Sequence, residues 1–579
     1  MMLLAALAIG LIAGFGAVLF RGMIGGFHNL FFLGQLSFDY DANVHTPASP
    51  WGFWIIGVPV LGAVGVAFLV KTFAPEAKGH GVPEVMEAIY YHEGKIRPVV
   101  AAVKSVASAL SIGSGGSVGR EGPIIQIGAA FGSTVGQVIA MPVRQRAILI
   151  AAGAGGGIAA TFNTPLGGIV FAIELMLPYV SPLSLLPVAL SCVTATYIGR
   201  FYFGLLPAFN VPGLAQLEGH GIQLWFLPCF VVFGLLMGLV SAAMVRSIYW
   251  FEDLFDAMPG NYYTRHMSGM LLVGLIMLGF LSYSSAWFGQ PNHYYIQGVG
   301  YATILDILRN DLTAVGFLLV LSLAKLLVTC LTLGSGASGG VFSPALFIGA
   351  ALGAAAGSGL SQLFPNLGVS PAQFAYVGMA AMIGGTTGAA ITGTIMVFEM
   401  TRDYAVILPV IVTVVLAGAI RHWLSAPTIY TLKLLRRGHV VPQGLQAWMG
   451  EQRAENVMTS NFVRFTEAEA TDKNAVRQAL LVGQVVLLIG SDHQVCGVIE
   501  AWSQADSLAE RPVAPLASHV IVKPEERLHE VLRRMDQAEA RVALVTQGAP
   551  SGGQGEVVGI ISERQIAVMA RATARLMGG

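Results

Sequence analysis

A single carboxylate lies inside a glycine-rich stretch of an otherwise apolar chain. Residues 113–123 read GSGGSVGREGP, and residues 334–344 repeat the frame as GSGASGGVFSP without the charged pair. Glycines let backbone N–H groups approach a ligand closely, and proline is suited to the first helical turn. A helix N-terminus carries unpaired donors and about +0.5 elementary charge. Each stretch is therefore predicted to present an anion-binding helix start, with the helices beginning at Pro123 and Pro344.

The carboxylate of Glu121 is interpreted as a built-in anion. A third glycine–proline helix start, GHGVPEV, lies at 79–85. Three such helix ends could hold a dehydrated anion without a formal positive charge, which would bind it too tightly for it to leave. Glu121 is predicted to occupy that site and to leave it when protonated or displaced. Phe342 takes the corresponding place in the second copy as an uncharged wall.

The repeat extends beyond these two stretches. Lys104 and Lys325 are 221 residues apart, and each lies nine residues before its GSG. The sequences IGAAFGSTVG (127–136) and IGAALGAAAG (348–357) recur at the same offset, and two further echoes keep the same order. We infer two homologous halves, about 1–215 and 223–425. Such a duplication predicts a substrate site near the membrane midplane, where interrupted helices of both halves meet.

Composition places most of the chain in a bilayer. Of 579 residues, 55% are hydrophobic and 11% charged, and the mean hydropathy is +0.68. The run at 3–20 is predicted to be an uncleaved first span rather than a signal peptide, because it lacks a basic leader. The net charge of zero argues against a nucleic-acid partner. The four cysteines are widely scattered, so neither a disulfide framework nor a metal site is expected.

Many of the apolar blocks are short or broken by glycine and proline. Interrupted helices at membrane depth persist only where they line a cavity or are buried in protein, which is typical of transporters and channels. The predicted fold is therefore an all-α polytopic membrane protein of broken helices. Blocks after the first span are expected at 53–73, 98–112, 123–141, 147–177, 183–203, 223–246, 268–288, 311–333, 341–360, 373–400 and 404–420.

The last part of the chain has a different composition. Residues 451–579 hold 16 of the 32 acidic residues, and they predict a soluble α/β domain with two strand–helix–strand–strand units. The basic cluster KLLRR (433–437) lies in the expected juxtamembrane linker, 426–450, and indicates the cytosolic side.

The motifs GHGVP, GREGP and GVFSP, in this order within a duplication, resemble the signature motifs of the CLC family of chloride channels and proton–chloride exchangers. The resemblance runs over about residues 5–430 and implies the CLC fold, with an inverted repeat in residues 1–425. It also implies a homodimer in a bacterial inner membrane, with one chloride path in each subunit and no cofactor. The anion-binding residues that it implies are Gly79, His80, Gly81, Val82, Pro83, Gly119, Arg120, Glu121, Gly122, Pro123, Gly340, Val341, Phe342 and Tyr430.

The resemblance also assigns roles. Glu121 matches the family's external gating glutamate, and Phe342 its pore-lining phenylalanine. Tyr430 matches the tyrosine at the inner end of the anion path, and Lys104 resembles a lysine that adds positive potential behind the pore. Its repeat mate Lys325 is interpreted as a packing or snorkelling residue.

One departure from the family pattern is His80, which stands where a serine is common. Three interpretations stay open: a neutral imidazole that donates one N–H to the ion, a pH-sensitive gate with an altered anion preference, or a side chain turned away from the path. Because other residues occur here in relatives that prefer nitrate or fluoride, the preferred anion is left open.

A second departure concerns mechanism. Leu175, in NTPLGGIVFAIELMLP (163–178), stands where exchangers carry an internal glutamate that relays protons. Leucine cannot carry a proton, so passive, gated anion conduction is favoured and proton-coupled exchange is the alternative. The neighbouring Glu174 and its repeat mate Glu399 are expected to be structural. An intramembrane enzyme is disfavoured, because Glu121 has no catalytic partner in a recognisable motif.

Residues 451–579 resemble a tandem pair of CBS domains, which many CLC proteins carry. Nucleotide-binding pairs often place an acid three positions after a hydroxyl residue, whereas here Ser562 is followed by Gln565. A regulatory scaffold is therefore favoured over an adenine-nucleotide sensor.

Overall fold

The computed structural model describes residues 1–177, 180–209, 227–365, 368–402, 406–441, 452–466, 468–482, 485–490, 495–499, 519–548, 556–567 and 569. The chain divides into two compact units, Met1–Val440 and Val441–Gly579. The expected boundary between the two halves, 216–222, lies outside the described residues, as do residues 442–450 of the expected linker.

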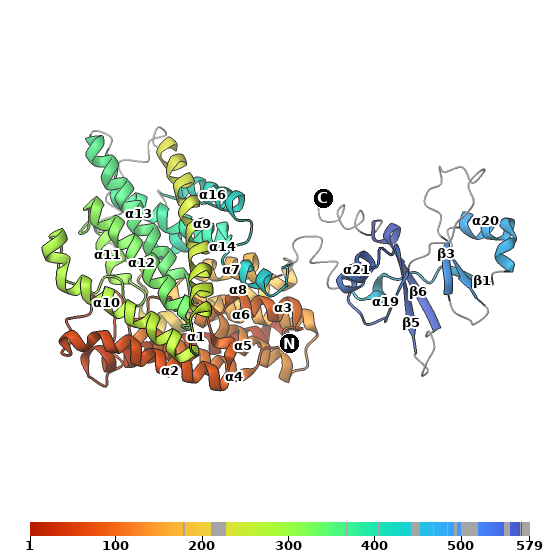
Figure 1. The fold of residues 1–579 in the computed structure, drawn as a ribbon, viewed down its shortest axis with the longest axis horizontal. Helices are drawn as coiled ribbons and strands as arrows, with labels where there is room; N and C mark the ends of the chain where they lie inside the picture. The colour runs from red at the N-terminus through yellow and green to blue at the C-terminus, as the bar shows by residue number, and fades with distance from the viewer. Residues whose placement is uncertain are drawn as a thin grey trace. The chain divides into compact units, whose positions relative to one another are not determined.

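The described part of the first unit is helical (Figure 1). Its helices are α1 (Met2–His28), α2 (Gly57–Phe73), α3 (Val82–Tyr91), α4 (Pro98–Gly113), α5 (Glu121–Val138), α6 (Val143–Phe162), α7 (Pro165–Phe171), α8 (Pro182–Phe203), α9 (Leu227–Ala257), α10 (Tyr262–Phe288), α11 (Tyr301–Leu308), α12 (Val315–Ser335), α13 (Phe342–Leu363), α14 (Pro371–Thr387), α15 (Ala390–Thr401), α16 (Ile407–Leu424) and α17 (Thr431–Arg436). Eight helical segments of the described chain are long and apolar enough to cross a membrane.

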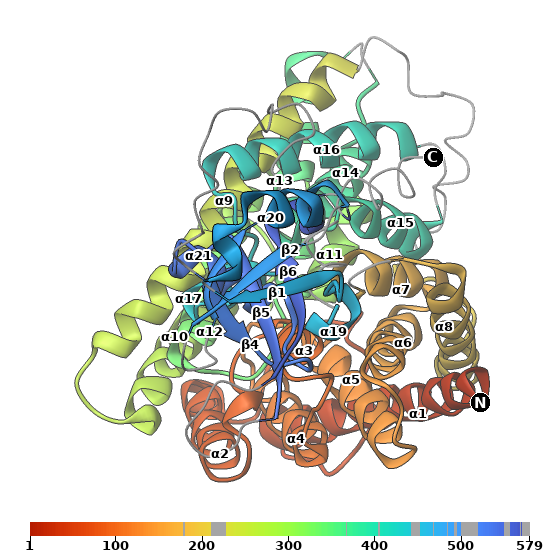
Figure 2. The same ribbon diagram turned by 90° about the vertical axis from the view of Figure 1, so that its right-hand side faces the viewer.

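The same packing order occurs twice. In the first half α6 packs against α1, α5, α7 and α8, and in the second half α14 packs against α9, α13, α15 and α16. Figure 2 shows the first group in the lower part of the helical unit and the second group in the upper part. The repeat inferred from short similar segments of the sequence therefore corresponds to the same helix packing in both halves.

The shared IGAA sequences lie at two equivalent helix crossings. A Cβ on Gly128 of α5 would collide with the Gly153 carbonyl of α6, and a Cβ on Gly349 of α13 would collide with the Gly378 carbonyl of α14. Small residues let helix backbones approach this closely. These glycines thus place α5 and α13, whose N-termini form the candidate site.

Two of the expected apolar blocks are divided in the structure. The block 147–177 is broken between α6 and α7, where Asn163 adopts a left-handed conformation with φ of 61°. The block 373–400 is broken between α14 and α15 at Gly388, with φ of 77°. Hydropathy did not reveal these breaks, because apolar residues continue on both sides of them.

The described part of the second unit contains two small sheets of like topology. Strands β1 (Phe462–Thr466), β2 (Val485–Ile489) and β3 (Val495–Ile499) form one, and β4 (His519–Val522), β5 (Val542–Gln547) and β6 (Glu556–Ser562) the other. In each, the first pair is parallel, as in Phe462 opposite Val485, and the second antiparallel. Helices α19 (Ala454–Val457), α20 (Lys473–Leu481) and α21 (Leu528–Gln537) lie in the described part of this unit, and residues 563–567 are also helical.

Each parallel pair is joined through a helix with an apolar face. In α21, Leu528, Val531 and Met535 are buried in a cluster with residues of β4, β5 and β6. The predicted helical membrane part followed by an α/β domain is the architecture observed.

Candidate functional site

The three glycine-rich segments meet in the interior of the helical unit. Gly119 and Gly340 exchange two backbone hydrogen bonds, each of 2.7 Å. The N–H of Gly79 donates to the Ala337 carbonyl over 3.0 Å, and the N–H of Gly339 donates to the Gly79 carbonyl over 3.2 Å. Backbone pairing between the two halves therefore joins the segments that the sequence predicted to converge.

A helix begins at each of these segments. Helix α3 begins at Val82, after Gly81 with φ of 88°, and carries Pro83 in its first turn. Helices α5 and α13 begin at Glu121 and Phe342, two residues before the expected prolines. Proline is tolerated there because N–H groups of the first turn have no intrahelical partner.

Close backbone contact explains two of these glycines. A Cβ on Gly122 would collide with the carbonyl oxygen of His80, and a Cβ on Gly81 would lie 3.0 Å from the Gly122 carbonyl oxygen. The segment around His80 is thus packed directly against the first turn of α5.

The buried carboxylate of Glu121 reaches the N-terminus of α13. Its Oε2 accepts a 3.3 Å hydrogen bond from the Ser343 N–H, and its Oε1 accepts hydrogen bonds from the Ser343 hydroxyl and, over 2.6 Å, from the Tyr301 hydroxyl. The side chain is fully buried. A negative group therefore rests where the helix end of the opposite half offers donors to an anion.

Tyr301 and Ser343 are site residues that the sequence analysis missed. Tyr301 begins α11 after Gly300, which has φ of 78°, just as Val82 begins α3 after Gly81. The sequences GVGY (298–301) and GHGV (79–82) share the two glycines. That echo was the available signal for Tyr301, whereas Ser343 could have been found as the hydroxyl beside Phe342.

Arg120 supports this arrangement without pairing with the carboxylate. Its guanidinium carbon lies 5.1 Å from the centre of the Tyr301 ring and 5.8 Å from that of Phe162. A cation over an aromatic face is attracted by the ring quadrupole. The positive charge therefore acts on Tyr301, which in turn holds Glu121.

Phe342 and Val341 are buried at the start of α13. The rings of Phe342 and Phe162 lie 6.0 Å apart, and the Phe162 and Tyr301 rings 6.4 Å apart. These aromatic side chains form a cluster with Tyr301, whose hydroxyl contacts Glu121, and the role of Phe342 as a wall stays a prediction.

Lys104 and Lys325 make equivalent contacts. Lys104 Nζ donates to the carbonyls of Ala77 and Gly79 over 3.0 and 2.7 Å, and Lys325 Nζ donates to those of Ile296 and Gly298 over 2.9 and 2.8 Å. Both side chains are fully buried. Lys325 is therefore not a snorkelling residue. Each lysine fixes the glycine turn before a short helix, one preceding His80 and the other preceding Tyr301.

His80 is buried among aromatic and cationic side chains. Its ring lies 6.1 Å from that of Tyr249 and 6.5 Å from that of Tyr430. Its Nδ1 is buried, with no hydrogen-bond partner in the described part of the chain. The three interpretations of His80 given above therefore stay predictions, and its neighbours include Tyr430, the residue expected at the inner end of the path.

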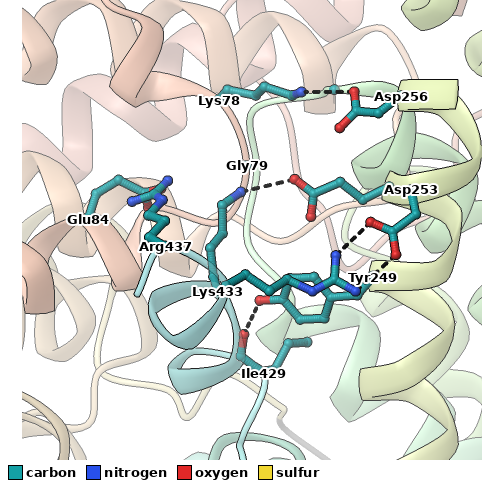
Figure 3. A network of polar contacts seen from close by, with 12 residues as sticks. Lys78, Gly79, Glu84, Tyr249, Asp253, Asp256, Ile429, Lys433 and Arg437 are labelled. Carbon is teal, nitrogen blue, oxygen red and sulfur yellow. Dashed lines mark hydrogen bonds and ion pairs between the residues drawn. The ribbon is translucent and has the colours of Figure 1, made fainter. Parts of the chain in front are cut away.

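Tyr430 immediately precedes α17, which polar contacts hold in place (Figure 3). The Tyr249 hydroxyl of α9 donates to the Ile429 carbonyl over 2.5 Å. Lys433 Nζ donates to Glu252 over 3.3 Å. These contacts fix the backbone on both sides of Tyr430.

The basic cluster of the linker is held in place by ion pairs. Arg436 makes two hydrogen bonds, of 2.7 and 2.9 Å, to Asp253, and these raise the pKa of Arg436 above its ordinary value. Arg437 pairs with Glu84 and Glu87 of α3 over 3.0 and 2.5 Å. Helix α17 is thereby tied to α9 and to the helix that follows the first glycine motif.

Leu175 lies in a short π-helical turn, Ala172–Met176, after α7. The neighbouring Glu174 accepts backbone hydrogen bonds from Ile391 and Thr392, at the start of α15, over 3.2 and 2.8 Å. Glu399 accepts bonds from Leu166 and Gly167, at the start of α7, over 3.2 and 2.7 Å. Each glutamate therefore caps a helix of the other half, which confirms the structural interpretation of both.

Known proteins resemble this chain over much of its length. The family model described as "Voltage gated chloride channel" matches residues 62–422. The H(+)/Cl(-) exchange transporter ClcA of Vibrio parahaemolyticus is 33% identical over 430 residues, covering 72% of this chain and 88% of the relative.

Solved structures are similar as well. A slow cyanobacterial Cl-/H+ antiporter aligns with a TM-score of 0.65 and 27% identity, covering 75% of this chain and 97% of that one. A eukaryotic CLC transporter aligns with a TM-score of 0.61 over 97% of both chains at 19% identity, which is a likeness of fold. With the eight apolar helices, these matches identify a multi-pass integral membrane protein. The chain belongs to the CLC family, that of the voltage-gated chloride channels.

Proposed function

We propose that the protein exchanges chloride for protons across a bacterial inner membrane, with Glu121 as the gate. The observation that carries the proposal is the contact of the Glu121 carboxylate with the N-terminus of α13. A carboxylate and a chloride ion compete for the same backbone donors, and protonation of the carboxylate weakens its hold on them. One site can therefore couple the two ions.

The relatives support exchange rather than passive conduction. Sequence analysis favoured a passive channel because Leu175 replaces the relay acid. The Vibrio parahaemolyticus relative is named an exchanger, and the cyanobacterial structure is titled an antiporter. Passive conduction remains the second candidate, because no acid stands at Leu175 and because Glu174 is engaged in capping.

The remaining assignments are part of the same proposal. Gly79–Pro83, Gly119–Pro123, Gly340–Phe342 and Tyr430 line the anion path, and Lys104 acts by fixing the turn before His80. The unit Met1–Val440 forms the transport domain, and residues 451–579 form a cytosolic CBS pair that acts as a regulatory scaffold. Two copies of the chain form a homodimer.

The reversal potential of purified protein in a planar bilayer tests the exchange. Under opposed pH and chloride gradients, an exchanger reverses at a potential that moves with the pH gradient. A passive anion path reverses at the chloride Nernst potential whatever the pH difference, and that result would replace exchange by conduction. The Glu121→Gln variant is expected to lose the pH response of anion flux, and an unchanged flux–pH profile would refute the gate assignment.

A further inference from the structure

A proton that moves between Glu121 and the inner end of the path needs a titratable group or a file of water molecules to carry it. Four titratable side chains of the described residues are engaged elsewhere. Lys104 and Lys325 each donate to two carbonyls, and Glu174 and Glu399 cap helices. These groups hold the fold together, and protonating or deprotonating them would break the contacts that do so.

The buried histidines differ in whether a ring nitrogen has a hydrogen-bond partner. The three in the described chain are His28, His80 and His266. His28 Nε2 bonds to the Thr46 hydroxyl over 3.1 Å, and His266 Nδ1 bonds to the Ser335 hydroxyl over 2.9 Å. His80 Nδ1 has no such partner within the described residues. A buried polar atom left without a partner is unfavourable, so this nitrogen requires an explanation.

Cations surround His80 on several sides. Lys104 of α4 bonds to the carbonyl of the preceding residue, Gly79. Lys433 of α17 lies close enough that a Cβ on Gly79 would be 3.2 Å from its Nζ. Arg437 follows α17 and pairs with Glu84, four residues after His80. Tyr249 of α9 and Tyr430 complete the surroundings.

In this environment each protonation state of His80 has an unfavourable feature. A neutral imidazole leaves the Nδ1 lone pair without a donor, or its N–H without an acceptor. A charged imidazolium beside these cations is repelled by them. An anion in the site removes both difficulties, because it accepts the N–H and offsets the positive charge.

We propose that His80 is the inner proton station of the transport cycle and that it takes up its proton together with the anion. This inference rests on the proposed exchange function. In the transfer step the N–H bond of the His80 imidazolium breaks, and an O–H bond forms on the Glu121 carboxylate through water that enters with the anion. No electrons are exchanged. The protonated Glu121 then releases the α13 N-terminus, and the neutral His80 is ready for the next proton.

Proton uptake on anion binding tests the station without requiring transport. The Glu121→Gln variant in detergent and weak buffer, with a pH dye, is expected to take up protons when chloride is added. Adding His80→Asn, which keeps a polar side chain that cannot titrate, should lower this uptake at least fivefold. The matched control is His266→Asn, which removes a buried histidine that already has a partner. Equal uptake with and without His80 would overturn the proposal.

A second measurement uses the unaltered side chain. In protein labelled with ¹⁵N-histidine, addition of chloride should shift one imidazole toward the imidazolium form, and that signal should be missing in His80→Asn. A His80 signal that ignores chloride would overturn the proposal even if the variant folds poorly.

Reversal potentials separate this inference from the function on which it rests. In the wild type the potential should move with the pH gradient, and in His80→Asn it should move at most a quarter as far. The potential does not depend on how many molecules are active, so a reduced flux does not obscure it. A wild type that ignores the pH gradient refutes exchange itself. A variant that follows the pH gradient as the wild type does refutes only the role of His80.

Discussion

Tyr301 donates its hydroxyl hydrogen to Glu121 over 2.6 Å, so a residue of the second half holds the carboxylate that we propose as the gate. The same hydroxyl lies 2.9 Å from the Ser343 hydroxyl. The buried position of the carboxylate therefore depends on three donors of the second half, and weakening any of them should favour release of the carboxylate.

Tyr301→Phe removes one of these donors while keeping the ring. A hydrogen bond to a charged group contributes about 1.5–3 kcal/mol, so the balance between bound and released carboxylate should shift by about 10- to 150-fold. Hydrogen bonding favours the charged form, and its loss makes protonation easier. Chloride efflux from liposomes is therefore expected to rise, and the flux–pH curve to move toward higher pH.

The control for this variant is Tyr294→Phe, another buried tyrosine, whose hydroxyl accepts from the Ser49 N–H. It should leave the flux–pH curve in place. If the two variants behave alike, the Tyr301 hydroxyl does not hold the gate.

Gly119→Ala should displace the gate by steric contact. A Cβ at this position would collide with Oε2 of Glu121 and lie 3.1 Å from the Ser343 N–H. The carboxylate must then leave its donors, so we expect increased chloride flux and a weaker dependence on pH. Gly316→Ala is the matched control, because a Cβ there meets no atom within 4 Å. A flux–pH profile like that of the wild type would contradict the assigned position of Glu121.

Lys325→Met should loosen the turn that presents Tyr301. The variant leaves the carbonyls of Ile296 and Gly298 without their donor, which costs about 1–3 kcal/mol for each buried group. The flux–pH curve should therefore shift as in Tyr301→Phe, together with a lower midpoint of thermal unfolding. Lys104→Met, the equivalent change in the other half, should lower the unfolding midpoint without that shift. The same shift in both variants would mean that general loosening, rather than Tyr301, is responsible.

The Glu174→Gln variant distinguishes a helix-capping role of Glu174 from a role in proton relay. The amide is a weaker acceptor for the N–H groups of Ile391 and Thr392, so the unfolding free energy should fall by about 1–2 kcal/mol. The reversal potential should still follow the pH gradient as in the wild type. Glu399→Gln, which weakens the reciprocal cap, should match it in both measurements. Loss of the pH response in Glu174→Gln alone would make Glu174 the relay in place of His80.

The sequence by itself determined the membrane setting, the duplication and the residues of the three glycine motifs. These follow from local patterns: apolar composition, glycine beside proline, and echoes at a constant offset. The α/β character of the last part was also readable, because strand and helix periodicities differ. The family resemblance rested on the same motifs.

Only the tertiary structure decided what the charged groups contact. Glu121 and Tyr301 are 180 residues apart, and Glu174 and Thr392 are 218 apart. Lys325 was interpreted as a packing or snorkelling residue, and it is buried and donates to two carbonyls. The basic cluster after Tyr430 is paired with acids of α3 and α9. The partners of a side chain depend on how the two halves pack against each other. That packing rests on backbone hydrogen bonds and close glycine contacts, and the sequence does not show which residues they bring together.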